Sequence, residues 1–273
     1  MTSLACCTGK VYQGDEIPQG EVSVVADIKC YFAPKPEGAT LIEDTLIILA
    51  TDVFGYTLPN SRVLADKFTK ETSALCVIPD MFNGSELPPS LMDSMEPLMI
   101  PSSFFAKVSA VGALLYHMPG FMYRNPQSKC LEILQRVIKD FRVNKGIKKV
   151  AVIGYCWGGS LAIQLGCTDD IDVFVANHPG PFDIPKCIDK LKAPGAYSLT
   201  PNNDMAIKQP QCDQIIDLLK KKNNGTYKHE VKQYPTMVHG FAVRGNTKDP
   251  ETAINREECL KSNAAFIKEV LQI

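Results

Sequence analysis

Short apolar runs alternate along the chain with longer stretches in which apolar residues recur every three or four positions. The short runs predict β-strands, and the longer stretches predict amphipathic helices. The predicted strands are Asp27–Ala33, Leu46–Ala50, Ala74–Ile78, Lys149–Ile153, Val173–Asn177, Gly195–Leu199 and Lys228–Tyr234. The predicted helices are Asn60–Lys70, Cys130–Val143, Gly158–Leu165, Ile207–Lys222 and Glu251–Leu271.

Several predicted strands are apolar on nearly every residue, as in the runs LIILA, VAVIG and VFVA. Such strands are typical of a parallel sheet that is buried on both faces. Strands that alternate with helices indicate the same arrangement. We therefore expect an α/β fold, with a mostly parallel sheet and helices on both faces, formed by a single domain over residues 1–273. The active site should lie beyond the carboxyl ends of the strands.

One segment interrupts this rhythm. Residues 79–103 contain several prolines and methionines. Prolines disfavour a long regular helix there, and methionine suits an adaptable apolar surface. A long excursion after a strand is often a lid or binding loop. The segment is therefore either a lid or binding loop, or a simple cover over an irregular edge of the core.

The charge balance argues against polyanionic partners. The chain has 29 Lys and Arg against 30 Asp and Glu, for a net charge of -1. Nucleic acids and anionic membranes require clustered positive charge, whereas the one dense basic run, Lys220–Lys222, is typical of a solvated helix end. We therefore expect a small-molecule substrate, no nucleic-acid or membrane partner, and a monomer.

Ten cysteines occur in the chain. The opening residues MTSLACCTGK lack the basic and apolar regions of a signal peptide, and no apolar run reaches the ~20 residues that span a bilayer. We therefore expect a cytoplasmic protein whose thiols are mostly reduced. The adjacent Cys6 and Cys7 lack a second cluster with zinc-like spacing, so we predict no metal site and no cofactor.

The strongest local motif is Gly154-Tyr155-Cys156-Trp157-Gly158-Gly159. It follows a predicted buried strand and precedes a predicted helix, which is the pattern of a nucleophile elbow with cysteine in place of serine. The helix N-terminus favours a thiolate on Cys156 and frees the backbone N–H of Trp157 for an oxyanion. The alternative is a buried structural cysteine beside a glycine that packs a helix.

A sulfur nucleophile requires a base, and the chain has four histidines. His239 follows the last predicted strand, as the base of an elbow enzyme does. His178 comes too early in the chain for that order and is interpreted as a pocket residue. His229, inside a predicted strand, is interpreted as a surface residue, and His117 as a packed one.

The orienting acid should follow the strand between the nucleophile and the base. Asp204 lies in a turn-rich segment after Gly195–Leu199. The alternative for Asp204 is an ordinary Asx-turn or helix cap. Asp213 and Asp217 fit less well because they lie inside the predicted helix. Cys156, His239 and Asp204 are therefore the predicted catalytic residues.

These residues resemble the dienelactone hydrolases, also called carboxymethylenebutenolidases, over most of the chain. The resemblance rests on Asp52-Val53-Phe54-Gly55, Arg62, Ala65-Asp66, Pro79-Asp80, the Cys156 motif, Asp204 and His239-Gly240-Phe241. The opening Cys6-Cys7, together with Thr57-Leu58-Pro59-Asn60, is similar to the fungal branch.

The resemblance implies an α/β-hydrolase fold, a Cys–His–Asp triad, and the backbone N–H of Val53 as a second oxyanion donor. It also implies that Asp52 contacts the cysteine and influences its ionisation, although the family commonly has glutamate there. The two arginines that hold a substrate carboxylate in bacterial members are not reproduced. Arg244 lies one position later than expected, and no arginine follows Pro79-Asp80. Candidate substrate-binding residues are Arg244, His178 and Met81.

We therefore expect a cysteine-dependent hydrolase that opens small lactones or esters through a thioester intermediate. One alternative is a thioesterase or general carboxylesterase that uses the same residues. Another is a non-catalytic redox-responsive or ligand-binding protein that keeps a reactive cysteine.

Overall fold

The computed structural model describes residues 16–99, 102–222 and 228–273, and its centre is one eight-stranded sheet. The spatial order of the strands is β1-β2-β4-β3-β5-β6-β7-β8. Their bounds are β1 Glu21–Val25, β2 Ile28–Phe32, β3 Ile42–Ala50, β4 Ala74–Pro79, β5 Lys149–Tyr155, β6 Val173–Asn177, β7 Gly195–Leu199 and β8 His229–Gln233. The strands from β4 to β8 pair in parallel, and β1 and β2 form an antiparallel edge.

The predicted α/β class and the mostly parallel sheet are confirmed. All seven predicted strands are present, whereas the edge strand β1 was not predicted because four of its five residues are exposed and give no buried face. Cys6 and Cys7 lie outside the described residues. The single domain over residues 1–273 includes such residues and stays a prediction.

Alternate residues of the central strands enter two separate cores. Leu46 and Ile48 of β3 face one hydrophobic cluster, and Ile47 and Leu49 face the other. Each fully buried Ile or Leu side chain contributes about 1.5–3 kcal/mol to folding. Both faces must therefore be covered, which explains why these runs are apolar throughout.

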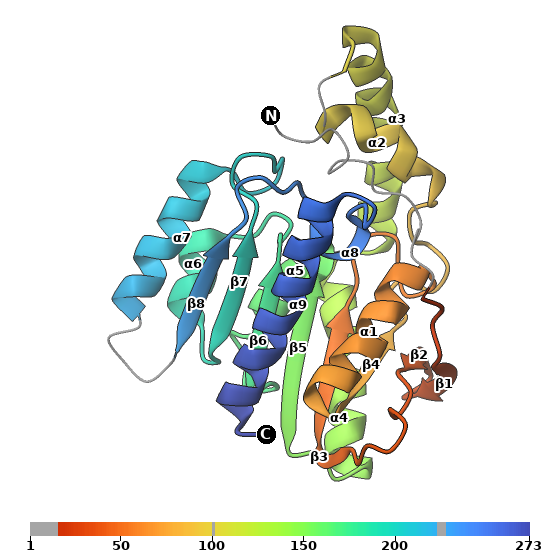
Figure 1. Ribbon diagram of the computed structural model, residues 1–273, viewed down its shortest axis with the longest axis vertical. Coiled ribbons are helices and arrows are strands. Elements are labelled where there is room, and N and C mark those ends of the chain that lie inside the picture. The colour runs from red at the N-terminus through yellow and green to blue at the C-terminus, as the bar shows by residue number, and fades with distance from the viewer. Residues whose placement is uncertain (1–15, 100–101, 223–227) are drawn as a thin grey trace.

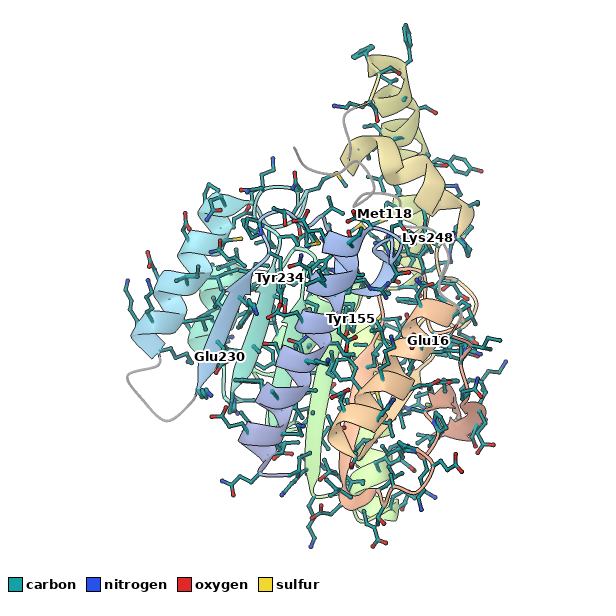
Figure 2. All side chains as sticks on the ribbon, viewed as in Figure 1. Glu16, Met118, Tyr155, Glu230, Tyr234 and Lys248 are labelled. Carbon is teal, nitrogen blue, oxygen red and sulfur yellow. The ribbon has the colours of Figure 1, made fainter. Side chains whose placement is uncertain are left out.

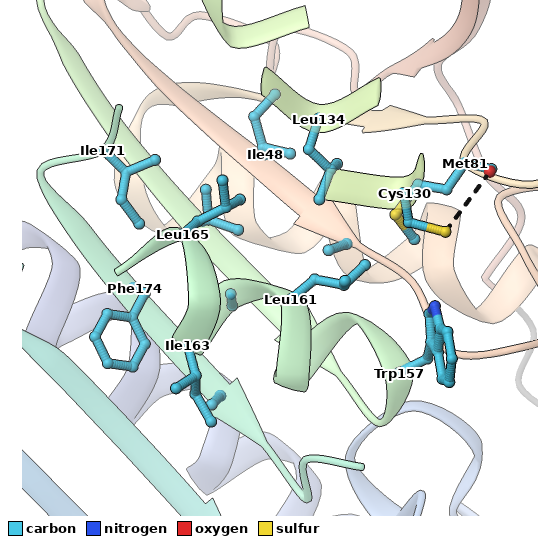
Figure 3. Packing of buried hydrophobic residues seen from close by; sticks show 14 of the residues in the cluster. Ile48, Met81, Cys130, Leu134, Trp157, Leu161, Ile163, Leu165, Ile171 and Phe174 are labelled. Carbon is cyan, nitrogen blue, oxygen red and sulfur yellow. Dashed lines mark hydrogen bonds between the residues drawn. The ribbon is translucent and has the colours of Figure 1, made fainter. Parts of the chain in front are cut away.

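Helices cover the two faces (Figure 1). The larger core packs under α4 Gln127–Asn144, α5 Trp157–Leu165, α6 Ile184–Lys190 and α7 Gln209–Lys222. The smaller core packs under α1 Pro59–Thr72, α8 Phe241–Arg244 and α9 Pro250–Leu271. Figure 3 shows Leu161 of α5, Leu134 of α4 and Ile48 of β3 in the larger core. Tyr155 and Tyr234, labelled in Figure 2, belong to the smaller one.

The irregular segment after β4 is more helical than expected. Residues Ser90–Met99 form α2 despite Pro97, and Phe104–Arg124 form α3, which projects from the body of the protein (Figure 1). Leu87, Leu91 and Met92 are buried in the larger core, so this part of the segment covers the core. Within the described ranges, no helix combines the length and apolarity required to cross a membrane.

Candidate active site

Cys156 lies at the turn between β5 and α5, at a partly exposed position. Its backbone is left-handed, with φ 52° and ψ -111°, which costs a non-glycine residue about 1–3 kcal/mol. The flanking glycines make the turn possible. A Cβ on Gly154 would lie 2.0 Å from the carbonyl oxygen of Gly158, and one on Gly158 would lie 2.0 Å from that of Ala50. The predicted elbow geometry is therefore present.

The loop after β6 fixes the backbone of Cys156. The Cys156 N–H donates to the carbonyl oxygen of Asn177 at 3.1 Å, and the Cys156 carbonyl accepts from the N–H of Gly180 at 2.8 Å. The side chain of Asn177 is itself held by Asn263, whose Nδ2 donates to Oδ1 at 2.8 Å. These bonds offset the strain of the turn and hold the sulfur at the sheet edge.

Asp204 and His239 meet beyond the carboxyl ends of β7 and β8. The Nδ1 atom of His239 lies 2.8 Å from Oδ2 of Asp204. The carboxylate is buried and also accepts from the Thr200 hydroxyl at 2.7 Å and the Ala206 N–H at 2.7 Å. Burial acts to raise the pKa of Asp204, but the charge of His239 and these hydrogen bonds lower it overall. Asp204 thus accepts hydrogen bonds within its own turn and also contacts the His239 imidazole.

The imidazole of His239 also lies near Cys156, close enough for the two residues to interact electrostatically. Burial by itself would lower the pKa of His239. The charges of Cys156 and Asp204, with a hydrogen bond to each, instead raise it to about 10. A histidine that holds its proton in this position carries a positive charge beside the sulfur. Three side chains that are far apart along the chain therefore lie in the order sulfur, imidazole, carboxylate.

Two backbone N–H groups were predicted to bind an oxyanion. Trp157 is the first residue of α5, and an N–H in the first turn has no carbonyl partner within its own helix. Val53 follows β3, in the loop next to the elbow. The carbonyl oxygen of Val53 accepts from the N–H of Leu87 at 2.9 Å. The N–H of Gly158 donates to the carbonyl oxygen of Thr51 at 3.0 Å. The loop and the elbow are therefore joined by the backbone.

Asp52 and Arg244 contact each other, which was not expected from the sequence. The Asp52 carboxylate accepts from Arg244 Nε at 2.9 Å and from the Phe54 N–H at 3.0 Å. Both side chains are buried, and the Arg244 guanidinium lies 5.1 Å from the Phe54 ring. Arg244, predicted to bind substrate, is thus committed to Asp52, because a buried carboxylate requires a cation.

Two further predicted substrate contacts lie below the surface. His178 is fully buried, with φ 33°, and its ring centroid lies 5.0 Å from that of His239. Burial, and then the charge of His239, lower the pKa of His178, so its ring is neutral. Met81 is 1% exposed and packs in the larger core, near Cys130 (Figure 3). His178 is thus buried next to His239, whereas Met81 is a residue of the larger core.

The remaining histidines do not reach the site. His117 contacts the Tyr116 ring on α3. The interpretation of His229 as a surface residue was wrong, because it is 5% exposed at the start of β8, where it pairs with Gly195. Among the described residues, no group of three or more His, Cys, Asp or Glu side chains could hold a metal ion.

Comparison with known proteins gives one family. The model of the "Dienelactone hydrolase family" matches residues 31–271. Hydrolase tropI of Talaromyces stipitatus is 25% identical over 90% of this chain and 88% of its own length. Hydrolase pyvD of Aspergillus violaceofuscus is 23% identical over 100% of both chains. The carboxymethylenebutenolidase homolog of Homo sapiens is 24% identical over 90% of this chain and 84% of its own.

Solved structures show the same fold. A putative dienelactone hydrolase from Klebsiella pneumoniae superposes with a TM-score of 0.59 at 17% identity, and covers 87% of this chain and 92% of its own. An esterase from Pyrobaculum calidifontis superposes with a TM-score of 0.57 at 14% identity, over 94% and 87% of the two chains.

Proposed function

Because this chain belongs to the dienelactone hydrolase family, and is therefore a hydrolase, we propose that it cleaves small esters or lactones with Cys156 as the nucleophile. His239 is the base and acid, and Asp204 orients it. The observation that carries this proposal is the position of His239 between Cys156 and Asp204, with His239 Nδ1 2.8 Å from Asp204 Oδ2.

In the proposed mechanism, the reaction begins with Cys156 as a thiolate and His239 as an imidazolium. The Cys156 thiolate attacks the carbonyl carbon, and the backbone N–H groups of Val53 and Trp157 bind the resulting oxyanion. Each such donor is worth ~3 kcal/mol in the transition state. As the tetrahedral intermediate collapses, His239 gives its proton to the leaving oxygen, and an acyl thioester remains on Cys156.

The second half of the reaction reverses these proton transfers. His239, now neutral, takes a proton from water, which attacks the thioester carbonyl. The carboxylic acid leaves, and the thiolate–imidazolium pair is restored. Asp204 holds the Nδ1–H of His239, so Nε2 is the atom that faces the sulfur and the substrate.

The chemistry of sulfur limits the substrate class. A thiolate is a better leaving group than an amine, so a tetrahedral intermediate from an amide expels the thiolate more readily than the amine, and amide cleavage is disfavoured. Enol and aryl esters expel a weakly basic oxygen and proceed. Arg244 is paired with Asp52, so the proposal favours uncharged activated esters over substrates whose carboxylate needs a free arginine.

We also propose that the protein works in a reducing compartment, as a monomer. The described cysteines are all free, and disulfides persist mainly in oxidising compartments.

The test is a panel of an enol lactone, an aryl ester and an aryl thioester, each measured with wild type, Cys156→Ala and Cys212→Ala. Cys212 is a buried cysteine of α7 and serves as the matched control. We expect turnover of the lactone and aryl ester that Cys156→Ala abolishes and Cys212→Ala retains. Preferential turnover of the thioester would make the protein a thioesterase, and no turnover of any member would leave a non-catalytic protein.

A further inference from the structure

A second pair of thiols lies away from the active site. Cys167 follows the end of α5, and Cys187 lies in α6. The Cys167 thiol donates to the backbone carbonyl oxygen of Cys187, with Sγ 3.3 Å from that oxygen, and each of the two thiols influences the pKa of the other. Both are partly exposed, whereas the other described cysteines outside the active site are buried, namely Cys30, Cys76, Cys130, Cys212 and Cys259.

The backbone keeps the two residues together. The N–H groups of Lys192 and Ala193 both donate to the carbonyl oxygen of Gly166, at 2.8 and 3.0 Å. The chain that leaves α6 is therefore fixed beside the residue that precedes Cys167. A disulfide requires two cysteines whose backbones are close and whose side chains point toward each other. The contact between the Cys167 thiol and the Cys187 backbone, on chains fixed in this way, places the two cysteines beside each other.

The two thiols also differ in acidity. The hydrogen bond from Cys167, helped by the charge of Lys186, lowers the pKa of Cys187 to about 7, against the opposing effects of burial and Asp183. The same hydrogen bond raises the pKa of the Cys167 thiol. The two pKa values shift in opposite directions, so Cys187 is the more acidic thiol of the pair. Since the thiolate is the nucleophile, Cys187 is the residue that attacks first.

Both thiols face a surface pocket of about 400 Å³. Lys186 and Lys190 supply positive charge to its wall, and Gln127 and Gln164 supply amide groups. A pocket of this size has room for part of a small molecule, and the two lysines favour an anionic one. Asp183 is the acidic residue of the same wall.

From this geometry we propose that Cys187 and Cys167 form a redox-active dithiol that reduces acidic low-molecular-weight disulfides. The Cys187 thiolate attacks one sulfur of the disulfide RSSR, which forms a mixed disulfide and expels RS⁻. Cys167 then loses its proton and attacks the Cys187 sulfur, which forms the Cys167–Cys187 disulfide and expels a second RS⁻. The dithiol loses two electrons, and RSSR gains them as two RSH.

This site is separate from the hydrolase. Cys156 precedes the first residue of α5 and Cys167 follows its last turn, so about 13 Å of helix lies between them. The dithiol can therefore be tested in a chain that lacks the catalytic sulfur.

The experiment uses the full chain carrying Cys156→Ala, with oxidised glutathione as the probe. After alkylation of the remaining thiols, peptide mass spectrometry locates each disulfide. We expect a peptide pair linked through Cys167 and Cys187. Cys167→Ser should accumulate a glutathione adduct on Cys187, because the resolving thiol is gone. Cys187→Ser should react at least about tenfold more slowly, because the more acidic thiol is gone. Cys212→Ser is the matched control and should behave as the parent does.

The proposal is overturned if no linked peptide forms, or if Cys187→Ser reacts as fast as Cys167→Ser. A rate that does not rise as pH passes through about 7 would also overturn it. Replacing oxidised glutathione with cystamine, a cationic disulfide, tests the charge preference. Faster reaction with cystamine would refute the role of Lys186 and Lys190.

Discussion

Arg244 and Asp52 form a buried ion pair, with Nε 2.9 Å from Oδ2, that joins the loop after β3 to the helix that follows His239. The two residues are 192 positions apart in the chain. The pair therefore links the loop that carries Val53 to the loop that carries His239, the base in the proposed mechanism, and so ties one side of the proposed active site to the other.

Removal of Arg244 alone should strongly destabilise the folded protein. Arg244→Leu leaves the Asp52 charge buried without a partner, which we expect to lower the free energy of unfolding by about 3–5 kcal/mol. The double variant Asp52→Leu/Arg244→Leu should recover much of that loss, because no uncompensated charge remains. Urea denaturation of the three proteins measures this. If the double variant is no more stable than Arg244→Leu, the unpaired Asp52 charge is not the cause of the lost stability.

Loss of the Asp204 charge should impair catalysis more than folding. Asp204→Asn keeps the size of the side chain but no longer fixes the His239 tautomer, so we expect kcat for an aryl ester to fall by about 10²-fold or more. Asp213→Asn is the matched control, because Asp213 is exposed in α7 and hydrogen-bonds to Gln209. Equal activity of the two variants would remove Asp204 from the mechanism.

The raised pKa of His239 has a direct spectroscopic test. The imidazole should titrate near pH 10, and Cys156→Ala should lower that pKa because the charge beside the ring is lost. The same shift affects stability, because the folded protein binds the proton more tightly than the unfolded chain does. The stabilisation that this raised pKa provides is complete at pH values below ~6.5, the pKa of histidine in the unfolded chain. It declines as the pH rises and is lost above about pH 10.

NMR titration of His239 checks the first point, and denaturation at pH 6 to 10 checks the second. The loss of stability over this range should be smaller in His239→Gln than in wild type. If the His239 ring titrates near 6.5 in wild type and Cys156→Ala does not change that pKa, the proposed interaction between the Cys156 charge and the His239 ring is contradicted.

The elbow glycines should tolerate no side chain. Gly158→Ala would place a Cβ 2.0 Å from the carbonyl oxygen of Ala50, so the turn must move or the chain must unfold. We expect a loss of more than about 3 kcal/mol of folding free energy. Gly112→Ala is the control, since a Cβ there meets nothing within 4 Å, and it should raise helix stability by up to ~1 kcal/mol. Thermal unfolding compares them.

The strands and the elbow could be predicted because their signals are local. The apolar runs of β3, β5 and β6 are too continuous for an exposed strand, and Gly154 and Gly158 flank a cysteine at a strand–helix junction. His239 and Asp204 followed from the order of elements along the chain. Their contact at 2.8 Å agrees with that order.

What the sequence could not predict depends on distant partners. Nothing near Arg244 in the chain indicates that Asp52 neutralises it, so a substrate contact was the simpler expectation. His229 resembles a surface residue of a polar strand, yet it is 5% exposed, opposite Gly195 of the neighbouring strand β7. The hydrogen-bonded Cys167 and Cys187 lie 20 residues apart, and no spacing motif marks them.

The central claim is that Cys156 carries the acyl group during turnover. Wild type should be mixed with an aryl ester, quenched with acid within one turnover, and digested for peptide mass spectrometry. We predict an acyl group on the peptide that contains Cys156, with a burst of phenol equal to one per chain, and neither in Cys156→Ala. An acyl group on another residue, or unchanged turnover in Cys156→Ala, would contradict the account.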